Sequence, residues 1–152
     1  MNNQAIAKRF HQLAALMEIR GDDPFRLRSY RNAAEAIEVW PTPLQEIVDK
    51  EGIAGLQTIP GVGKAIAGKV VDLLEHGSFD AWDRLVAETP ETVLELLELP
   101  GIGPKTAALL HQRFHVSSLK QLKEFVAGGG LDKVEGIGSK TAERIREKLK
   151  GF

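Results

Sequence analysis

The sequence predicts an all-α protein made of short helices joined by tight turns. Apolar residues recur at helical spacing along most of the chain, and no stretch alternates convincingly between polar and apolar residues with period two. One glycine-containing pattern also occurs three times. We expect roughly ten helices in two subdomains, residues 1–86 and 87–152, with the boundary inside the segment VAETPE.

The first two helices have clear start and stop signals. The first ends at Gly21, and the second begins at Asp22-Asp23-Pro24 and ends before Pro41. Each carries an apolar stripe, which predicts the face that it buries. The stripes are Ile6, Phe10, Leu13 and Met17 in the first helix and Leu27, Tyr30, Ala34 and Ile37 in the second.

Later helix boundaries are predicted from cap residues and glycines. Thr42 and Thr89 each precede a proline, which predicts an N-cap followed by proline at the first helical position. Ser78 and Ser118 are further predicted N-caps. Gly52, Gly77 and the triplet 128–130 mark stops or turns.

The repeated pattern occupies residues 59–70, 99–110 and 134–145. The three copies read IPGVGKAIAGKV, LPGIGPKTAALL and VEGIGSKTAERI. Each contains Gly-apolar-Gly, an alanine four residues after the second glycine and a branched apolar residue seven residues after it. A single turn of this kind is often only an economical connection between helices. Three copies in register, each with a lysine at the turn, indicate repeated functional units.

We expect each unit to be a helix, a tight hairpin and a second helix, anchored by the central Val or Ile. Glycines permit positive φ and the close approach of another backbone, while the free amides and dipole of the second helix favour an anion such as phosphate. The predicted phosphate-binding residues are Gly61, Val62, Gly63 and Lys64 in the first hairpin, Gly101, Ile102, Gly103 and Lys105 in the second, and Gly136, Ile137, Gly138 and Lys140 in the third.

The first copy also resembles a nucleotide-binding P-loop, because residues 63–69 spell G-x-x-x-x-G-K. A P-loop needs a Ser or Thr after the lysine to ligate Mg²⁺, and a buried strand before the glycines. Val70 occupies the Ser/Thr position, and the preceding EGIAGLQTIP segment is not strand-like. The sequence therefore excludes a P-loop.

Charge is distributed unevenly behind a formal net charge of −1. Residues 41–98 carry four Lys/Arg against eleven Asp/Glu, whereas residues 99–152 carry ten against five. A basic face for an anionic partner is therefore expected in the last third. The absence of cysteine excludes disulfides and thiolate metal sites, and no apolar run is long enough to predict a membrane span.

The three repeats match the helix-hairpin-helix motif. Together with the segment DPFRLRSYRNAAEAI at 23–37, the chain resembles the N-terminal region of a bacterial family X DNA polymerase, the family that includes DNA polymerase beta. In that family a small helical lyase domain precedes further helix-hairpin-helix units and the polymerase palm. The resemblance implies sequence-nonspecific binding of gapped, nicked or 5′-phosphorylated DNA. It also implies a monovalent cation (Na or K) at hairpin carbonyls, without side-chain ligands.

The resemblance further implies a 5′-end site in the first subdomain. Lys69 matches the lysine that attacks the sugar aldehyde in lyase-active members, and Arg26 and Tyr30 match residues of the 5′-phosphate pocket. A lysine nucleophile must be neutral to attack, which cationic neighbours or burial favour. Three positions depart from the family pattern, and they leave lyase activity open: Phe25, Ala65 and Gly68.

Three functions remain open at this point: a DNA-binding module of a repair polymerase, a 5′-deoxyribose-phosphate lyase acting through Lys69, and a protein-interaction domain favoured by the acidic central segment. No set of carboxylates suggests a polymerase metal site, so we expect a palm in a longer chain or a separate protein. His111 and His115 are four residues apart but lack a third ligand, so a surface role is expected. We expect a cytoplasmic, nucleoid-associated monomer.

Overall fold

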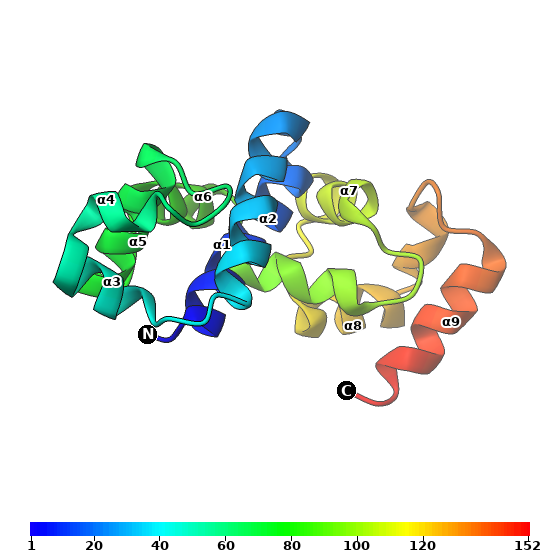
Figure 1. Ribbon diagram of the computed structural model, residues 1–152. Helices are drawn as coiled ribbons and strands as arrows, with labels where there is room; N and C mark the ends of the chain where they lie inside the picture. Colours follow the sequence, from blue (N-terminus) through cyan, green and yellow to red (C-terminus); the bar gives the residue numbers. More distant parts are fainter. The chain divides into compact units, whose positions relative to one another are not determined.

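The computed structural model describes residues 1–152 and contains helices, turns and short connections without a strand (Figure 1). The predicted all-α class is confirmed. In chain order the elements are α1 (Asn3–Arg20), α2 (Pro24–Glu38), α3 (Leu44–Glu51), α4 (Ile53–Leu56), α5 (Lys64–His76), α6 (Asp80–Glu88), the 3-10 helix η1 (Glu91–Glu98), α7 (Pro104–Phe114), α8 (Leu119–Ala127), the 3-10 helix η2 (Gly130–Lys133) and α9 (Ser139–Leu149).

The chain divides into two compact units, Met1–Glu88 and Thr89–Phe152. The boundary between them falls inside the VAETPE segment, in which the sequence placed a boundary after residue 86. The first unit contains α1 to α6 and the first hairpin, and the second contains η1 to α9 and the other two hairpins. None of the helices combines the length and apolar character needed to span a bilayer.

In the first unit, α1 and α2 pack along each other (Figure 1). Gly21 ends α1 in the left-handed conformation, with φ 88°, and Asp23 caps α2 by accepting a hydrogen bond from the Phe25 amide at 3.0 Å. Pro24 occupies the first turn of α2. The two predicted apolar stripes are buried throughout, with Ile6, Phe10 and Ile37 completely inaccessible. These boundaries and buried faces agree with the sequence prediction.

The predicted threonine caps are wrong. Pro43 and Pro90 themselves occupy the N-cap positions of α3 and η1, and neither helix start has a side-chain cap. Proline has no amide hydrogen and a fixed φ, so it suits a position just before the first helical residue as well as one just inside it. The threonines therefore lie one position too early.

The two predicted serine caps have different outcomes. Ser118 caps α8, because its hydroxyl accepts from the Gln121 amide at 3.1 Å. Ser78 instead donates its hydroxyl to the carboxylate of Asp83 at 2.6 Å.

Asn3 connects the start of α1 to the segment between α2 and α3. Its buried side-chain amide donates to the carbonyls of Trp40 at 3.2 Å and Thr42 at 3.0 Å, and its oxygen accepts from the Leu44 amide at 3.0 Å. Buried polar groups require such partners. Asn3 therefore fixes a connection that the apolar pattern alone leaves undefined.

Arg20, at the end of α1, joins two acidic groups of the first unit. Its guanidinium contacts Asp22, with an Nε–Oδ1 distance of 2.8 Å, and Glu88 at 3.1 Å. The hydrogen bond to Asp22, followed by the contribution of Glu88, raises the pKa of Arg20 above its already high ordinary value. The ion pairs are partly exposed, so their contribution to stability is small.

Side chains at both ends of the connection between α7 and α8 stabilise the second unit. His115 ends α7 in the left-handed conformation, with φ 56°, and the ring of His111 contacts the Ser117 hydroxyl at 3.0 Å. The Leu119 amide donates to the carboxylate of Glu95 in η1 at 3.0 Å. The two histidines thus have local roles at a helix end.

Candidate functional site

The three hairpins share one backbone geometry. The first glycine of each has positive φ, and the second has extended φ and forms the N-cap of the following helix. The φ angles are 82° at Gly61, 77° at Gly101 and 85° at Gly136, and −89° at Gly63, −98° at Gly103 and −80° at Gly138. In all three, the carbonyl of the second glycine accepts from the alanine four residues later at 2.9 Å. The sequence repeat therefore corresponds to a repeated local structure.

The first glycine of each hairpin is required by the protein's own fold. Positive φ is strained for other residues, and two of these glycines also lie against neighbouring atoms. A Cβ on Gly61 would lie 3.4 Å from the backbone nitrogen of Ala33 in α2, and one on Gly101 would lie 2.4 Å from Cγ2 of Thr141 in α9. Gly136 has open space around its Cβ position, so only its φ requires glycine.

The second glycines have no such requirement. A Cβ on Gly63, Gly103 or Gly138 would meet no atom of the chain within 4 Å. Their negative φ angles suit any residue. Packing and backbone conformation therefore do not explain why glycine occupies these positions.

The helices that follow the hairpins begin without side-chain caps. No side chain accepts a hydrogen bond from the first-turn amides of α5, α7 or α9. These amides lack intrahelical acceptors, and the helix dipole gives this end a positive potential. Lys64, Lys105 and Lys140 lie in the first turns and are exposed. Each hairpin therefore presents free N–H donors and a cation together.

The central apolar residue anchors only two of the hairpins. Val62 and Ile102 are each 4% exposed, and their amides donate to Ile59 at 3.0 Å and Leu99 at 3.2 Å, respectively. Ile137 is half-buried, and no corresponding turn hydrogen bond closes its hairpin. The expectation that this residue anchors every hairpin is wrong for the third, which is less tightly packed at this position.

The structure brings together Lys69 and Tyr30, two residues of the predicted 5′-end site. Lys69 in α5 is half-buried, and its Nζ lies 5.8 Å from the ring centroid of Tyr30 in α2. Tyr30 is itself fixed by stacking on Phe10, with ring centroids 6.1 Å apart. Arg26 is exposed on α2, one turn before Tyr30.

The two other arginines of α2, Arg28 and Arg31, have different interaction partners. Arg31 forms an ion pair with Glu18 at 3.0 Å, which reduces its availability as a cationic neighbour of Lys69. The guanidinium carbon of Arg28 lies 5.7 Å from the ring centroid of Phe25, which is 75% exposed. Phe25 is therefore not part of the core.

The side chains provide no cluster of three or more His, Asp or Glu residues suited to a metal ion. Backbone carbonyls of the kind present in the hairpins are suitable ligands for K⁺ or Na⁺. The monovalent cation stays a prediction.

Two helix-hairpin-helix family models match this chain. A helix-hairpin-helix domain model matches residues 1–79, and a SAM-like helix-hairpin-helix tandem model matches residues 53–115 and 93–150. The chain belongs to the helix-hairpin-helix domain family. The tandem matches include all three helix-hairpin-helix copies.

Two kinds of known protein are similar in sequence to this chain. The DNA polymerase/3′-5′ exonuclease PolX of Bacillus subtilis (strain 168) is 30% identical over 149 residues, which cover 98% of this chain and 25% of that protein. The Holliday junction branch migration complex subunit RuvA of Acidovorax sp. (strain JS42) is 28% identical over 117 residues, or 72% of this chain and 62% of RuvA. RuvA of Albidiferax ferrireducens is 46% identical over 57 residues, which cover 38% of this chain and 30% of RuvA.

The chain therefore corresponds to only part of each of these relatives. The match to PolX spans nearly all of this chain, and the helix-hairpin-helix models fit the N-terminal region of such an enzyme. The predicted resemblance to a family X polymerase is confirmed.

Proposed function

We propose that this protein binds DNA through the sugar-phosphate backbone at its helix-hairpin-helix units, without reading base sequence. The open second glycines, Gly63, Gly103 and Gly138, are the main support. Their φ angles and surroundings allow a side chain, so the protein's own fold does not require glycine there. The close approach of an external backbone does require the absence of a side chain.

The chemistry of the hairpins favours a phosphate as the bound group. Uncapped amides at the starts of α5, α7 and α9 can donate to phosphate oxygens, and the adjacent lysines supply positive charge. These groups recognise features that every nucleotide shares. Contacts of this type position a protein on DNA but do not distinguish sequences.

The names of the relatives support DNA as the partner, because one is a DNA polymerase and another a subunit of a Holliday junction complex. We assign this chain to the DNA-binding region of a repair polymerase, with gapped or nicked DNA and its 5′-phosphate as the preferred ligand. In this proposal, a polymerase palm lies in a longer chain or in a separate protein. Arg26 and Tyr30 belong to the site that holds the 5′-phosphate.

The position of Lys69 beside Tyr30 supports a second proposed activity, 5′-deoxyribose-phosphate lyase. The neutral Nζ of Lys69 attacks the C1′ aldehyde and forms an imine with loss of water. Removal of a C2′ proton then breaks the C3′–O bond and releases the 5′-phosphorylated DNA strand. Hydrolysis of the remaining imine returns the free lysine, so the cycle needs no redox partner.

DNA binding is tested by measuring affinity for two unrelated duplexes and a gapped duplex over a series of salt concentrations. We expect the two duplexes to bind equally, the gapped DNA to bind more tightly, and log K to fall by about 0.9 per contacted phosphate for each unit of log salt. Binding that does not depend on salt, or that differs strongly between the duplex sequences, would contradict backbone recognition. Equal affinity for gapped and intact duplexes would contradict only the preference for gaps.

A further inference from the structure

Helix α9 and its C-cap residue carry two matched basic pairs on opposite sides. One pair is Arg144 and Lys148, and the other is Arg146 and Lys150. Within each pair the residues are four positions apart, so they share a face. Corresponding members differ by two positions, which is about 200° around an α-helix. The pairs have the same composition but different surroundings.

The Arg144/Lys148 pair lies beside the second hairpin. A groove of about 410 Å³ is lined by Pro100, Arg144, Glu147, Lys148 and Gly151. Pro100 directly precedes Gly101, whose backbone contacts Thr141 one turn before Arg144. The second hairpin and this pair therefore belong to one surface of the second unit.

The charges of this pair are available to an external anion. Arg144 and Lys148 are exposed, and neither forms an ion pair within the chain. Glu147 also lines the groove, but its carboxylate is paired with Lys150 at 3.2 Å. Lys140 continues the row toward the third hairpin, because residues 140, 144 and 148 rise by about 6 Å per step along the helix.

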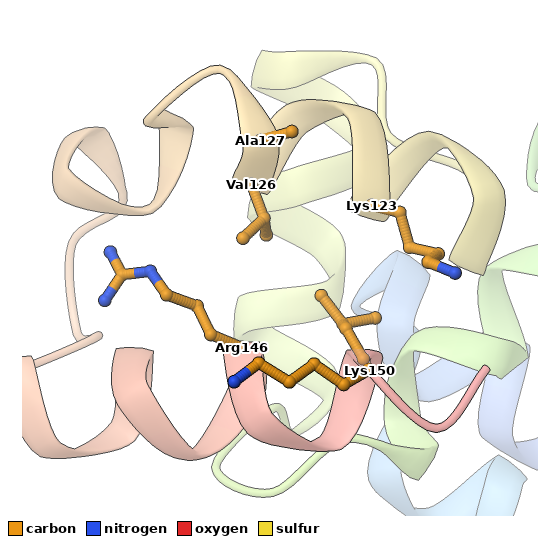
Figure 2. A pocket seen from close by; sticks show the side chains of 6 residues that line it. Lys123, Val126, Ala127, Arg146 and Lys150 are labelled. Atoms are coloured by element: carbon orange, nitrogen blue, oxygen red, sulfur yellow. The ribbon is translucent and has the colours of Figure 1, made fainter.

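The Arg146/Lys150 pair lies in a different environment, beside α8. Figure 2 shows a groove with Lys123, Val126 and Ala127 on α8 and Arg146 and Lys150 on α9. Its volume is about 430 Å³, and Leu149 completes an apolar floor. Val126 points from α8 toward α9 (Figure 2). Lys123 donates to the Phe152 carbonyl, and Lys150 pairs with Glu147. Two of the three cations at this groove, Lys123 and Lys150, therefore already have partners within the chain.

We propose that Arg144 and Lys148 form a phosphate-binding ridge that extends the contact of the second hairpin along α9. We call these two residues the α9 ridge. The proposal rests on the DNA binding inferred above and adds two residues that are not among the predicted phosphate-binding residues. The ligand is again the nucleic-acid backbone, because Arg144 and Lys148 are exposed beside the second hairpin and neither has an acidic partner within the chain. The Arg146/Lys150 pair takes no part in this contact.

The two pairs provide an internally matched experiment. Arg144→Gln/Lys148→Gln and Arg146→Gln/Lys150→Gln remove the same residue types and the same charge from the same helix. We expect the first double variant to reduce the magnitude of the salt slope for duplex DNA by about 1.8, which corresponds to two phosphate contacts at about 0.9 each. The second should change the slope much less, because Lys150 acts on the ridge only through the Glu147 carboxylate with which it pairs. Circular dichroism and thermal unfolding establish that both variants are folded.

Equal effects of the two double variants would overturn the ridge, because they would show only a general dependence on charge. An effect confined to Arg146→Gln/Lys150→Gln would overturn it too, since the contact would then lie on the α8 side. Gly103→Val in the same assay separates these failures from failure of the proposed function. If that variant weakens binding while Arg144→Gln/Lys148→Gln does not, the hairpin proposal stands and the ridge is wrong.

Discussion

A Cβ atom on Gly101 would lie 2.4 Å from Cγ2 of Thr141, so the second hairpin lies directly against the start of α9. Thr141 is the third residue of the helix that follows the third hairpin. This contact joins the two repeats of the second unit and fixes the spacing between the starts of α7 and α9. It also gives the paired glycines of the second hairpin distinct roles, because Gly103 has open space around it.

Substitution of the two glycines should therefore affect stability differently. Gly101→Ala introduces strain at φ 77°, which costs on the order of 1–3 kcal/mol, and adds a steric clash of similar cost. Gly103→Ala should change stability by less than about 0.5 kcal/mol. Urea unfolding of the two variants measures the difference. Thr141→Ser removes Cγ2, so combining it with Gly101→Ala should recover the part of the stability loss that comes from the steric clash. Equal stability of Gly101→Ala and Gly103→Ala would show that the contact with Thr141 is not tight.

Gly68 is predicted to be a site of stabilisation. It lies inside α5, and a Cβ there would meet no neighbouring atom within 4 Å. Alanine should stabilise this helix by about 0.5–1 kcal/mol, because glycine loses more backbone entropy on folding. Gly55→Ala is the matched comparison, since its Cβ would lie 2.8 Å from Ile47 Cγ2 and should destabilise the protein. Thermal unfolding that ranks the two variants in the opposite order would contradict this packing.

Asn3 should contribute strongly to the stability of the first unit. Asn3→Ala removes partners from two carbonyls and one amide in the segment 40–44, with an expected cost of about 1–3 kcal/mol. Gln4→Ala removes only an exposed contact to the Glu38 carbonyl and should cost less than about 0.5 kcal/mol. Chemical denaturation of both variants tests this difference, and a loss for Asn3→Ala no larger than for Gln4→Ala would be evidence against a fixed connection.

Borohydride reduction tests the proposed lyase activity. With DNA that carries an incised abasic site, the unmodified protein should form a covalent adduct, because reduction traps the imine. Lys69→Ala should lose most of this adduct, whereas Lys64→Ala, which keeps the nucleophile and lacks only a phosphate-binding cation, should lose no more than part of it. An adduct that survives in Lys69→Ala would assign the nucleophile to another amine. Absence of an adduct with the unmodified protein would leave DNA binding without lyase chemistry.

Much of the fold could be predicted from local signals. Gly21, Asp23 and Ser118 mark helix ends through interactions within a few residues, so the sequence alone identifies them. The predicted caps at Thr42 and Thr89 failed because a proline can occupy the N-cap itself. Local sequence does not distinguish these two positions.

The remaining features depend on contacts between distant residues. Asn3 finds its partners 37 to 41 positions away, so no local pattern predicts its role. The repeat predicted equal hairpins, yet Ile137 is less buried than Val62. Arg144 and Lys148 were absent from the predicted site, because helical spacing shows that they share a face but not that Pro100 lies beside them. A search for basic i,i+4 pairs near each hairpin would have found them, together with the Arg146/Lys150 pair.

The most direct measurement compares DNA affinity and unfolding for the double variant Gly103→Val/Gly138→Val. Both positions have negative φ and open surroundings, so the fold and its thermal midpoint should be retained. The added side chains should block phosphates from the helix amides. Loss of even one charge-assisted hydrogen bond, worth about 1.5–3 kcal/mol, reduces affinity by roughly tenfold or more. A folded double variant that binds duplex DNA with undiminished affinity would contradict the claim that the hairpins hold the DNA backbone.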